Sequence, residues 1–279
     1  MKKNIRNPIV AGLFYPSTAT EIRVLLESLK AAPNDSETNN DQTIVGGVVP
    51  HAGYIYSGKH AITFFQNIAK LAFDTAIILS PGHTGEGLEL SIDPHSHWQT
   101  PLGTIETDNE LIKSNLFTPN KEAQQKEHAA EVIIPMIQHF CPQIKNIAVI
   151  TMRNQSYKMA QEVAKGISNY QDNTKKRILI IASCDFSHFL SPNQGFENDS
   201  MVLHEIMSGN IRGIEEKIKK HNLSICGYGP IMALMLYLET KHKNIRYEVI
   251  SRGHSGEVCA SNSVVDYITI QASIPHQGL

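Results

Sequence analysis

TAIILSPGH, residues 75–83, joins an apolar, β-branched run to a histidine across a short turn. Two other stretches have the same form, VVPH at 48–51 and ILIIASCDFSH at 178–188. Apolar runs of this length, bounded by turn residues, are typical of buried strands. Because the loops at the carboxyl ends of the strands in an open α/β sheet converge on one crevice, we expect the three histidines to meet there. The pattern indicates an enzyme-like site rather than a binding module.

Strand-like and helix-like segments alternate through the rest of the chain, which indicates βαβ units and a mainly parallel sheet covered on both faces. Strands are predicted near 43–50, 74–80, 146–152, 177–184, 246–252 and 264–273, with a loop-rich stretch at 81–105. A capping box at 18–21 opens a first amphipathic helix that continues through residue 29. Further helices are predicted near 59–70, 107–117, 127–140, 157–170, 198–207, 210–220 and 229–241. The last two strands are expected to pair antiparallel across a short turn, which makes the sheet mixed.

The chain has one composition throughout and no internal repeat, so we expect a single domain over residues 1–279. The one tract of low hydrophobicity, at 33–42, is predicted to be a mobile surface loop. Near the start, the sequence is basic but lacks the apolar core of a signal peptide. We therefore expect a cytoplasmic protein.

Charge and cysteine content exclude several classes of function. The chain has 25 basic and 27 acidic side chains, a balance that predicts binding to neither nucleic acid nor an anionic membrane. No apolar run approaches the roughly 20 residues that span a bilayer. The four cysteines are scattered, without a C-x-x-C pair, which argues against a zinc ribbon or a disulfide scaffold: Cys141, Cys184, Cys226 and Cys259.

His51 and His83 each have a functional and a structural interpretation. His51 lies in a glycine-containing loop at a strand end, where it could be a metal ligand or general base, or simply bond to the backbone. His83 carries the same alternatives. The glycines around it could also cradle a phosphate, but their spacing matches neither a P-loop nor a dinucleotide-binding fingerprint.

Asp185 and His188 form a more specific pair. An aspartate three residues before a histidine at a strand exit can orient the imidazole and fix its tautomer, which leaves the other nitrogen free for a proton or a metal. The alternative is an Asx turn with an incidental histidine. The dense polar run after so apolar a strand favours a functional role.

His128 lies in EHAAE at 127–131, which is predicted to begin a helix. Glu127 and Glu131 suit a helix N-terminus electrostatically, and His128 on this first turn could still face the crevice. The pattern is not H-E-x-x-H and implies no zincin.

Cys226 precedes an apolar helix, whose dipole favours the thiolate. It could be a metal ligand, a nucleophile, or a small buried apolar residue. A serine hydrolase is discounted, because the segment around Ser255 lacks the G-x-S-x-G spacing.

In their order along the chain, these motifs resemble those of the Memo family, whose bacterial and archaeal members are known as AmmeMemoRadiSam system protein B. The resemblance is carried by AGLFYP at 11–16, HAGYIYSG at 51–58, SPGH at 80–83, EHAAE at 127–131, SCDFSH at 183–188 and CGYGPI at 226–231. It spans nearly the whole chain and implies a three-layer α/β/α fold around a mixed sheet, similar to class III extradiol dioxygenases of the LigB type. The chain departs from the family at Thr84, where a second consecutive histidine is frequent.

The resemblance implies that His51, His83 and Cys226 surround a metal-binding pocket, with Asp185 and His188 beside it. Iron or copper is the metal that the family suggests. A thiolate in place of the dioxygenase carboxylate softens the site and favours copper, zinc or a thiolate-ligated iron. Asp185, His188 and His128 are then the candidate catalytic residues.

The primary hypothesis is a metal-dependent redox or dioxygenase-like enzyme that acts on a small molecule of unknown identity. The first alternative is a non-catalytic metal-binding scaffold that captures a peptide or partner in the same crevice, and a metal-free cysteine enzyme ranks third. The resemblance also implies partners among the proteins of the AmmeMemoRadiSam system.

Overall fold

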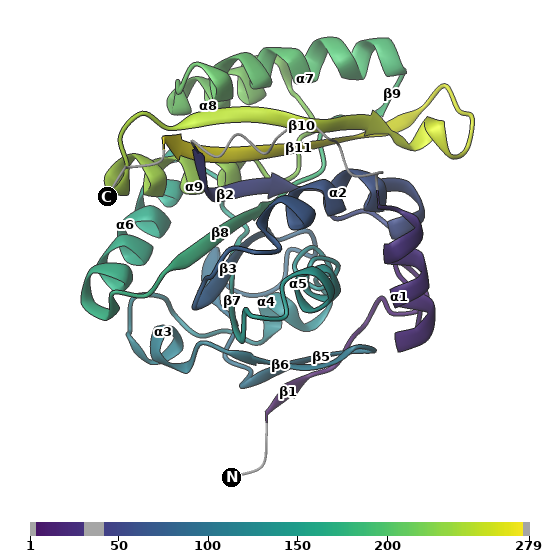
Figure 1. Ribbon diagram of the computed structural model, residues 1–279. Helices are drawn as coiled ribbons and strands as arrows, with labels where there is room; N and C mark the ends of the chain where they lie inside the picture. The colour runs from purple at the N-terminus through teal and green to yellow at the C-terminus, as the bar shows by residue number, and fades with distance from the viewer. Residues whose placement is uncertain (1–3, 31–41, 276–279) are drawn as a thin grey trace.

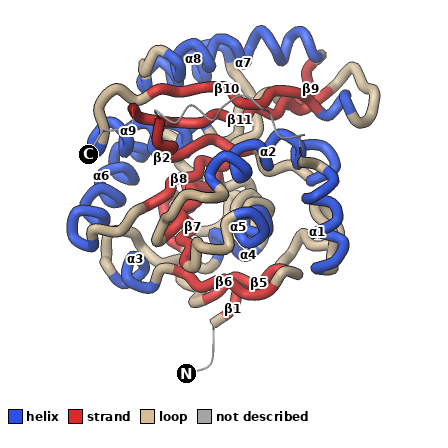
Figure 2. Tube along the Cα trace, in the orientation of Figure 1, coloured by secondary structure: helices blue, strands red, loops and turns tan. Residues whose placement is uncertain are grey.

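The computed structural model describes residues 4–30 and 42–275, and its centre is a mixed sheet between two layers of helices (Figures 1 and 2). The sheet order is β1-β5-β6-β7-β3-β8-β2-β11-β10, while β4 pairs with β7 and β9 pairs with β11. The predicted surface loop at 33–42 lies outside the described residues, apart from Gln42. The α/β class and the three layers expected from the sequence are confirmed.

The strands are β1 (Ile5–Arg6), β2 (Gln42–Val49), β3 (Thr75–Pro81), β4 (Leu90–Ile92), β5 (His97–Thr100), β6 (Gly103–Thr107), β7 (Asn146–Met152), β8 (Ile178–Ser183), β9 (His188–Leu190), β10 (Arg246–His254) and β11 (Val264–Pro275). The helices are α1 (Ala19–Ser28), α2 (Tyr54–Ile68), α3 (Asn109–Lys113), α4 (Glu122–Gln125), α5 (Ile134–Phe140), α6 (Tyr157–Thr174), α7 (Pro192–Met207), α8 (Ile211–His221) and α9 (Tyr228–Lys241), with a 3₁₀ turn η1 (Ser255–Glu257).

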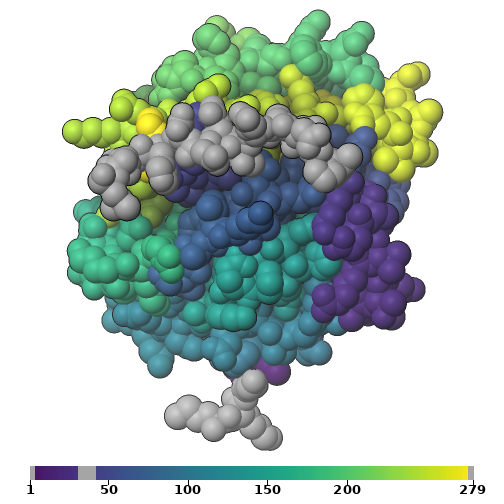
Figure 3. Space-filling model, viewed as in Figure 1, coloured from purple at the N-terminus to yellow at the C-terminus, as the bar shows by residue number. Residues whose placement is uncertain are grey.

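Alternate residues of each central strand enter two separate cores, one on each face of the sheet. In β3, Ile77 and Leu79 pack with α6, α7, α8 and α9. Ala76 and Ile78 point the other way and pack with α1, α2 and α5. This two-sided burial explains why the central strands read as continuous apolar runs. Figure 3 shows α7 and α8 along one edge of the molecule and α1 along another.

The parallel centre of the sheet is β6-β7-β3-β8-β2. Antiparallel pairs join β5 to β6, β4 to β7, and β11 to β2 and β10. β11 lies between β10 and β2 and runs antiparallel to both, as expected for the last two strands. Because β2, β3 and β8 are parallel neighbours, their carboxyl ends lie at the same edge of the sheet. His51, His83 and Asp185 follow these three ends.

Two glycines in β2 allow helices to pack closely on both sides of this strand. A Cβ at Gly46 would lie 2.8 Å from the Leu234 side chain of α9, and one at Gly47 would lie 2.4 Å from the Phe64 ring of α2. Real Cβ atoms essentially never make contacts this short, so a larger residue at either position would displace the helix side chain or the neighbouring strand. The glycines thereby fix the position of α2, whose first turn follows His51.

The sequence predictions fail where elements are short or begin in turns. The stretch 81–105, predicted to be loop, contains β4, β5 and part of β6, and these carry the fully buried Trp98. The helix predicted at 59–70 begins earlier, at Tyr54. The helix predicted at 127–140 begins only at Ile134, because residues 129–133 form turns. The helix predicted at 107–117 covers only Asn109–Lys113.

Among the described residues, no helix combines the length and apolar character needed to cross a bilayer.

Candidate metal centre

His51 is held in one tautomer by a chain of hydrogen bonds at the end of β2. Its Nδ1 lies 2.8 Å from Ser183 Oγ, and the Ser183 hydroxyl donates to the carbonyl of Ala129 at 2.8 Å. Because that hydroxyl has a single proton, Ser183 must accept from His51 Nδ1–H. Nε2 of the buried His51 is therefore the ring nitrogen directed at a metal. Although burial lowers the pKa of His51, Asp185 and Cys226 raise it above its usual value, so a metal would compete with a proton for this atom.

His83 is oriented in the same way by a buried carboxylate. Its Nδ1 lies 2.9 Å from Glu127 Oε1, and its backbone N–H donates to Glu127 Oε2 at 2.6 Å. The backbone N–H groups of His128 and Ala129 also donate to Glu127. Although burial raises the pKa of Glu127, hydrogen bonding and the charge of His83 lower it to about 2. An ionised Glu127 holds the proton on Nδ1 of His83. Although burial lowers the pKa of His83, Cys226 and Glu127 raise it to about 10, so a metal that binds at Nε2 would have to displace a proton.

Cys226 supplies a sulfur beside these two nitrogens. Its Sγ lies 3.5 Å from His51 Nε2 and accepts the backbone N–H of Asp185 at 3.3 Å. Burial raises the pKa of this thiol, but contacts with Cys184, His51 and His83 lower it well below its usual value. One ligand atom from each of His51, His83 and Cys226 lies within 4.8 Å of the other two.

This spacing fits the donor set of a transition metal. A thiolate at about 2.3 Å and an imidazole nitrogen at about 2.1 Å from a tetrahedral ion are roughly 3.6 Å apart. The separation between Cys226 Sγ and His51 Nε2 is 3.5 Å, and the ligand atom of His83 lies within 4.8 Å of both. The residues present therefore fit a metal ion bound by two imidazoles and one thiolate.

His128 lies against both histidines. Its ring stacks on His83 with centroids 5.0 Å apart and meets His51 edge-on at 5.6 Å. Burial, followed by the nearby charge of His51, lowers the pKa of His128 to about 4. A second potential metal-binding set, His83, Glu127 and His128, shares His83 with the first. Both sets therefore belong to one centre.

Asp185 and His188 are close to this centre, but they do not form the orienting pair that the sequence suggested. Asp185 Oδ1 accepts the backbone N–H of His51 at 2.8 Å, which ties the end of β8 to the end of β2. His188 Nδ1 instead donates to the carbonyl of Ser224 at 2.6 Å. Its partner is a main-chain oxygen that spacing along the sequence could not reveal. Nε2 of His188 remains the free nitrogen.

Ser183 and Glu127 are positioning residues that the sequence reasoning missed. Ser183 is the last residue of β8. A hydroxyl at the end of an apolar run is the one feature of the sequence that could have indicated its role. The sequence predicts that Glu127 lies at a helix N-terminus, whereas the helix begins seven residues later. An acidic side chain next to a candidate catalytic histidine was the available signal.

Comparison with known proteins shows the family of this chain. The family model described as Memo-like protein matches residues 6–271. The chain belongs to the Memo family. The MEMO1 family protein of Methanosarcina barkeri is 34% identical over 274 residues, covering 95% of this chain and 99% of the relative. That of Desulfurococcus amylolyticus is 35% identical over 289 residues, covering 97% and 99%.

A crystal structure of an uncharacterised protein from Escherichia coli K12 aligns with this Memo family chain at a TM-score of 0.49 and 12% identity. The alignment covers 82% of this chain and 99% of that protein. A likeness this distant carries no information about the site.

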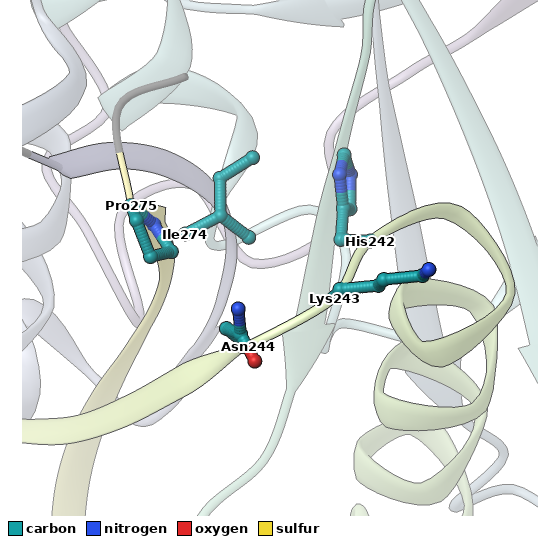
Figure 4. Close-up of a pocket in the computed structure, with 5 residues that line it drawn as sticks. All are labelled: His242, Lys243, Asn244, Ile274 and Pro275. Carbon is teal, nitrogen blue, oxygen red and sulfur yellow. The ribbon is translucent and has the colours of Figure 1, made fainter. Parts of the chain in front are cut away.

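A surface pocket at the opposite edge of the sheet is separate from the candidate centre (Figure 4). It is lined by His242, Lys243, Asn244, Ile274 and Pro275. Pro275 pairs with Gln42 at the beginning of β2, whereas His51 follows the end of that strand. The pocket therefore has no part in the chemistry of the histidine and cysteine cluster.

Proposed function

We propose that this Memo family protein binds one redox-active metal ion, iron or copper, and acts as a metal-dependent oxidoreductase of the dioxygenase-like kind on a small molecule. The ligands are His51 Nε2, His83 Nε2 and Cys226 Sγ. The observation that carries the proposal is the mutual approach of these three atoms, on side chains whose other polar atoms are already fixed. Two imidazoles and a thiolate suit copper, iron and zinc better than a hard, oxygen-preferring ion.

The bound metal would supply Lewis-acid and one-electron chemistry at a position that three protein ligands leave open. Ser183 and Glu127 fix the two imidazoles, so that little reorganisation accompanies binding. His188, with Nε2 free, takes the role of general base toward a substrate hydroxyl. Asp185 holds the two strand ends together, and His128 forms one wall of the centre.

Metal titration of single variants tests the ligand set. His51→Ala and His83→Ala should each weaken binding of Fe(II), measured anaerobically, by at least about 100-fold. His95→Ala is the matched control, because His95 also bonds to a buried aspartate, Asp93, but belongs to neither potential metal-binding set. If all three variants bind Fe(II) as tightly as the parent, the proposed ligands are wrong.

Alkylation of Cys226 separates a metal ligand from a free nucleophile. A metal-bound thiolate should resist iodoacetamide when Fe(II) is loaded and react after chelation, because coordination occupies its lone pairs. Peptide mapping is needed to distinguish Cys226 from Cys141, Cys184 and Cys259. Rapid alkylation in both states would favour the metal-free cysteine enzyme.

The proposed oxidoreductase activity requires an open coordination position on the metal. Addition of nitric oxide to the Fe(II)-loaded protein should give the paramagnetic signal of an iron nitrosyl, since this small ligand needs only one open position. A silent spectrum from protein shown to contain Fe(II) would contradict the oxidoreductase and leave a closed, non-catalytic site.

One observation favours the non-catalytic scaffold as second candidate. Phe189, directly after His188, has a side chain 75% exposed and a left-handed backbone with φ of 59°. Non-glycine residues in this conformation are uncommon and occur preferentially at functional sites. An exposed aromatic ring beside the centre suits capture of a peptide. In that case Phe189→Ala would abolish peptide binding while metal affinity stays unchanged.

A further inference from the structure

Cys184 lies directly against Cys226, although no step of the proposed function uses it. Cys184 is fully buried, and its Sγ lies 3.2 Å from the carbonyl oxygen of Asp185. Cys226 Sγ lies 3.4 Å from that same oxygen, and the two thiols are within hydrogen-bonding reach of each other. The backbone N–H of Gly227 also points at Cys184 Sγ, at 3.2 Å. Two sulfurs from distant parts of the chain therefore share one small space.

Gly227 makes this close approach sterically feasible. A Cβ on Gly227 would lie 2.6 Å from Cys184 Cβ and 2.3 Å from the carbonyl oxygen of Ser183. No larger residue fits there, so the backbone next to Cys226 presses directly on Cys184. A disulfide needs Cβ atoms about 3.5–4.5 Å apart, and backbones this close allow that distance without a large movement.

The two thiols differ in access to solvent. Cys226 is partly exposed, whereas Cys184 lies beneath it in the core. A small oxidant entering the centre therefore meets Cys226 first. Cys141 is buried elsewhere, against the carbonyl of Phe65, and Cys259 is exposed.

We propose that Cys184 and Cys226 form a reversible disulfide when the centre lacks its metal, with a hydroperoxide as the oxidant. The Cys226 thiolate attacks the terminal peroxide oxygen, the O–O bond breaks, and the leaving alkoxide or hydroxide takes a proton. Cys184 sulfur then attacks the sulfenic sulfur and releases water, which forms the S–S bond. Overall, the two thiols lose two electrons, which the hydroperoxide gains. An organic hydroperoxide becomes an alcohol and one water, and hydrogen peroxide becomes two waters.

This disulfide would remove the sulfur ligand from the centre, so that metal loading and oxidation exclude each other. Metal protection of Cys226 rests on the proposed function, whereas formation of the disulfide in the metal-free protein does not. A dithiol would restore the ligand, which distinguishes the bond from the irreversible sulfinic acid.

Peptide mapping of the full chain tests the proposal. Metal-free protein treated with hydrogen peroxide, then alkylated, should yield a Cys184–Cys226 linked peptide that disappears with dithiothreitol. Zn(II), a redox-inert probe metal, at about ten times its dissociation constant should lower the yield about tenfold, because only free protein reacts. Absence of the linked peptide from metal-free parent protein would overturn the proposal.

Variants make the test specific. Cys184→Ser and Cys184→Ala should lose the linkage, and Cys226 should progress to sulfinic acid instead. Cys141→Ser is the matched control and should keep the linkage. Persistence of reversible oxidation at Cys226 in both Cys184 variants would contradict the assigned partner. If the linkage forms but Zn(II) gives no protection, the proposed metal site fails while the disulfide stands.

Discussion

Glu127 and Glu131 are both fully buried in one short segment, yet their partners differ. Glu131 pairs with an arginine, whereas Glu127 bonds to a histidine of the candidate centre. Glu131 pairs with the buried Arg6 and also accepts the hydroxyl of Tyr15 at 2.7 Å and two backbone N–H groups. Arg6 in turn donates to backbone carbonyls and lies over the Trp98 ring. The charged groups of this pair therefore have their partners within the protein.

Glu127 also receives several hydrogen bonds, but one of its partners is His83, whose ring also contacts Cys226 of the candidate centre. The same acidic residue type therefore fastens the N-terminal segment at one position and prepares a ligand at the other. The comparison shows that burial of charge alone does not indicate function. A set of oriented ligand atoms that converge from distant segments does.

The largest expected effect is on the structural side of this comparison. Glu131→Gln leaves Arg6 buried without its counter-charge and should lower the free energy of unfolding by about 3–5 kcal/mol. Urea denaturation of the metal-free protein measures the change. Glu27→Gln is the control, because Glu27 pairs with Lys30 at the surface and such pairs contribute about 0–1 kcal/mol. Equal losses of unfolding free energy in both variants would show that the buried Glu131–Arg6 pair contributes no more than a surface pair.

Glu127→Gln should weaken metal binding by about 10–100-fold, because the amide cannot accept both the ring and the backbone N–H of His83. Anaerobic titration with Fe(II) gives the affinity. Glu131→Gln is the control, measured at a temperature where it is folded. If it lowers the affinity for Fe(II) as much as Glu127→Gln does, Glu127 has no specific role in orienting a metal ligand.

In a second pair of buried carboxyls, Asp199 and Asp266, the two side chains contact each other. Burial, opposed by hydrogen bonds from Ser187 and reinforced by the Asp266 charge, raises the pKa of Asp199 from 3.8 to about 7. The Arg252 guanidinium is 4.0 Å away, too far for a hydrogen bond. Since the folded state holds the proton more tightly, this stabilisation is complete below pH 4 and is lost as the pH rises to about 7.

Asp199→Asn should therefore flatten the pH dependence of unfolding by about 1–2 kcal/mol between pH 4 and 7, since asparagine resembles the protonated acid. Thermal denaturation across this pH range provides the measurement. An unchanged slope would mean that Asp199 is ionised throughout.

Ser183→Ala should have the smallest effect, a loss of about 1 kcal/mol or less in metal binding, because it frees His51 Nδ1 without altering charge. Isothermal titration with Zn(II) resolves a change of this size. A loss as large as that in His51→Ala would make Ser183 more than an orienting group.

The parallel centre of the fold was predictable because burial on both faces leaves apolar runs such as 75–79 and 178–182 in the sequence. The strands between 90 and 107 were not, since they are short and mix polar with apolar residues, and one buried tryptophan fixes them. Residues 127–131 look helical from their composition. Tertiary hydrogen bonds to Glu127 and Glu131 hold this segment outside a helix instead, with turns at 129–133.

The juxtaposition of His51, His83 and Cys226 followed from strand ends together with family resemblance, but the orienting partners did not. Ser183 and the carbonyl of Ser224 act through contacts between distant segments, and these leave no periodic pattern. The nearness of Cys184 to Cys226 likewise has no signature in cysteine spacing.

The strand order also determines when the centre can form. β2 pairs Gly46 with Ile180 of β8 and Val48 with Ile270 of β11, so its neighbours are distant in the sequence. Such non-local pairing slows folding, and the three ligand atoms converge only at its end. Metal present earlier meets scattered cysteines and histidines of the unfolded chain, where binding favours the wrong state. We therefore expect the highest yield of metal-loaded protein when the chain is refolded first and the metal is added afterwards.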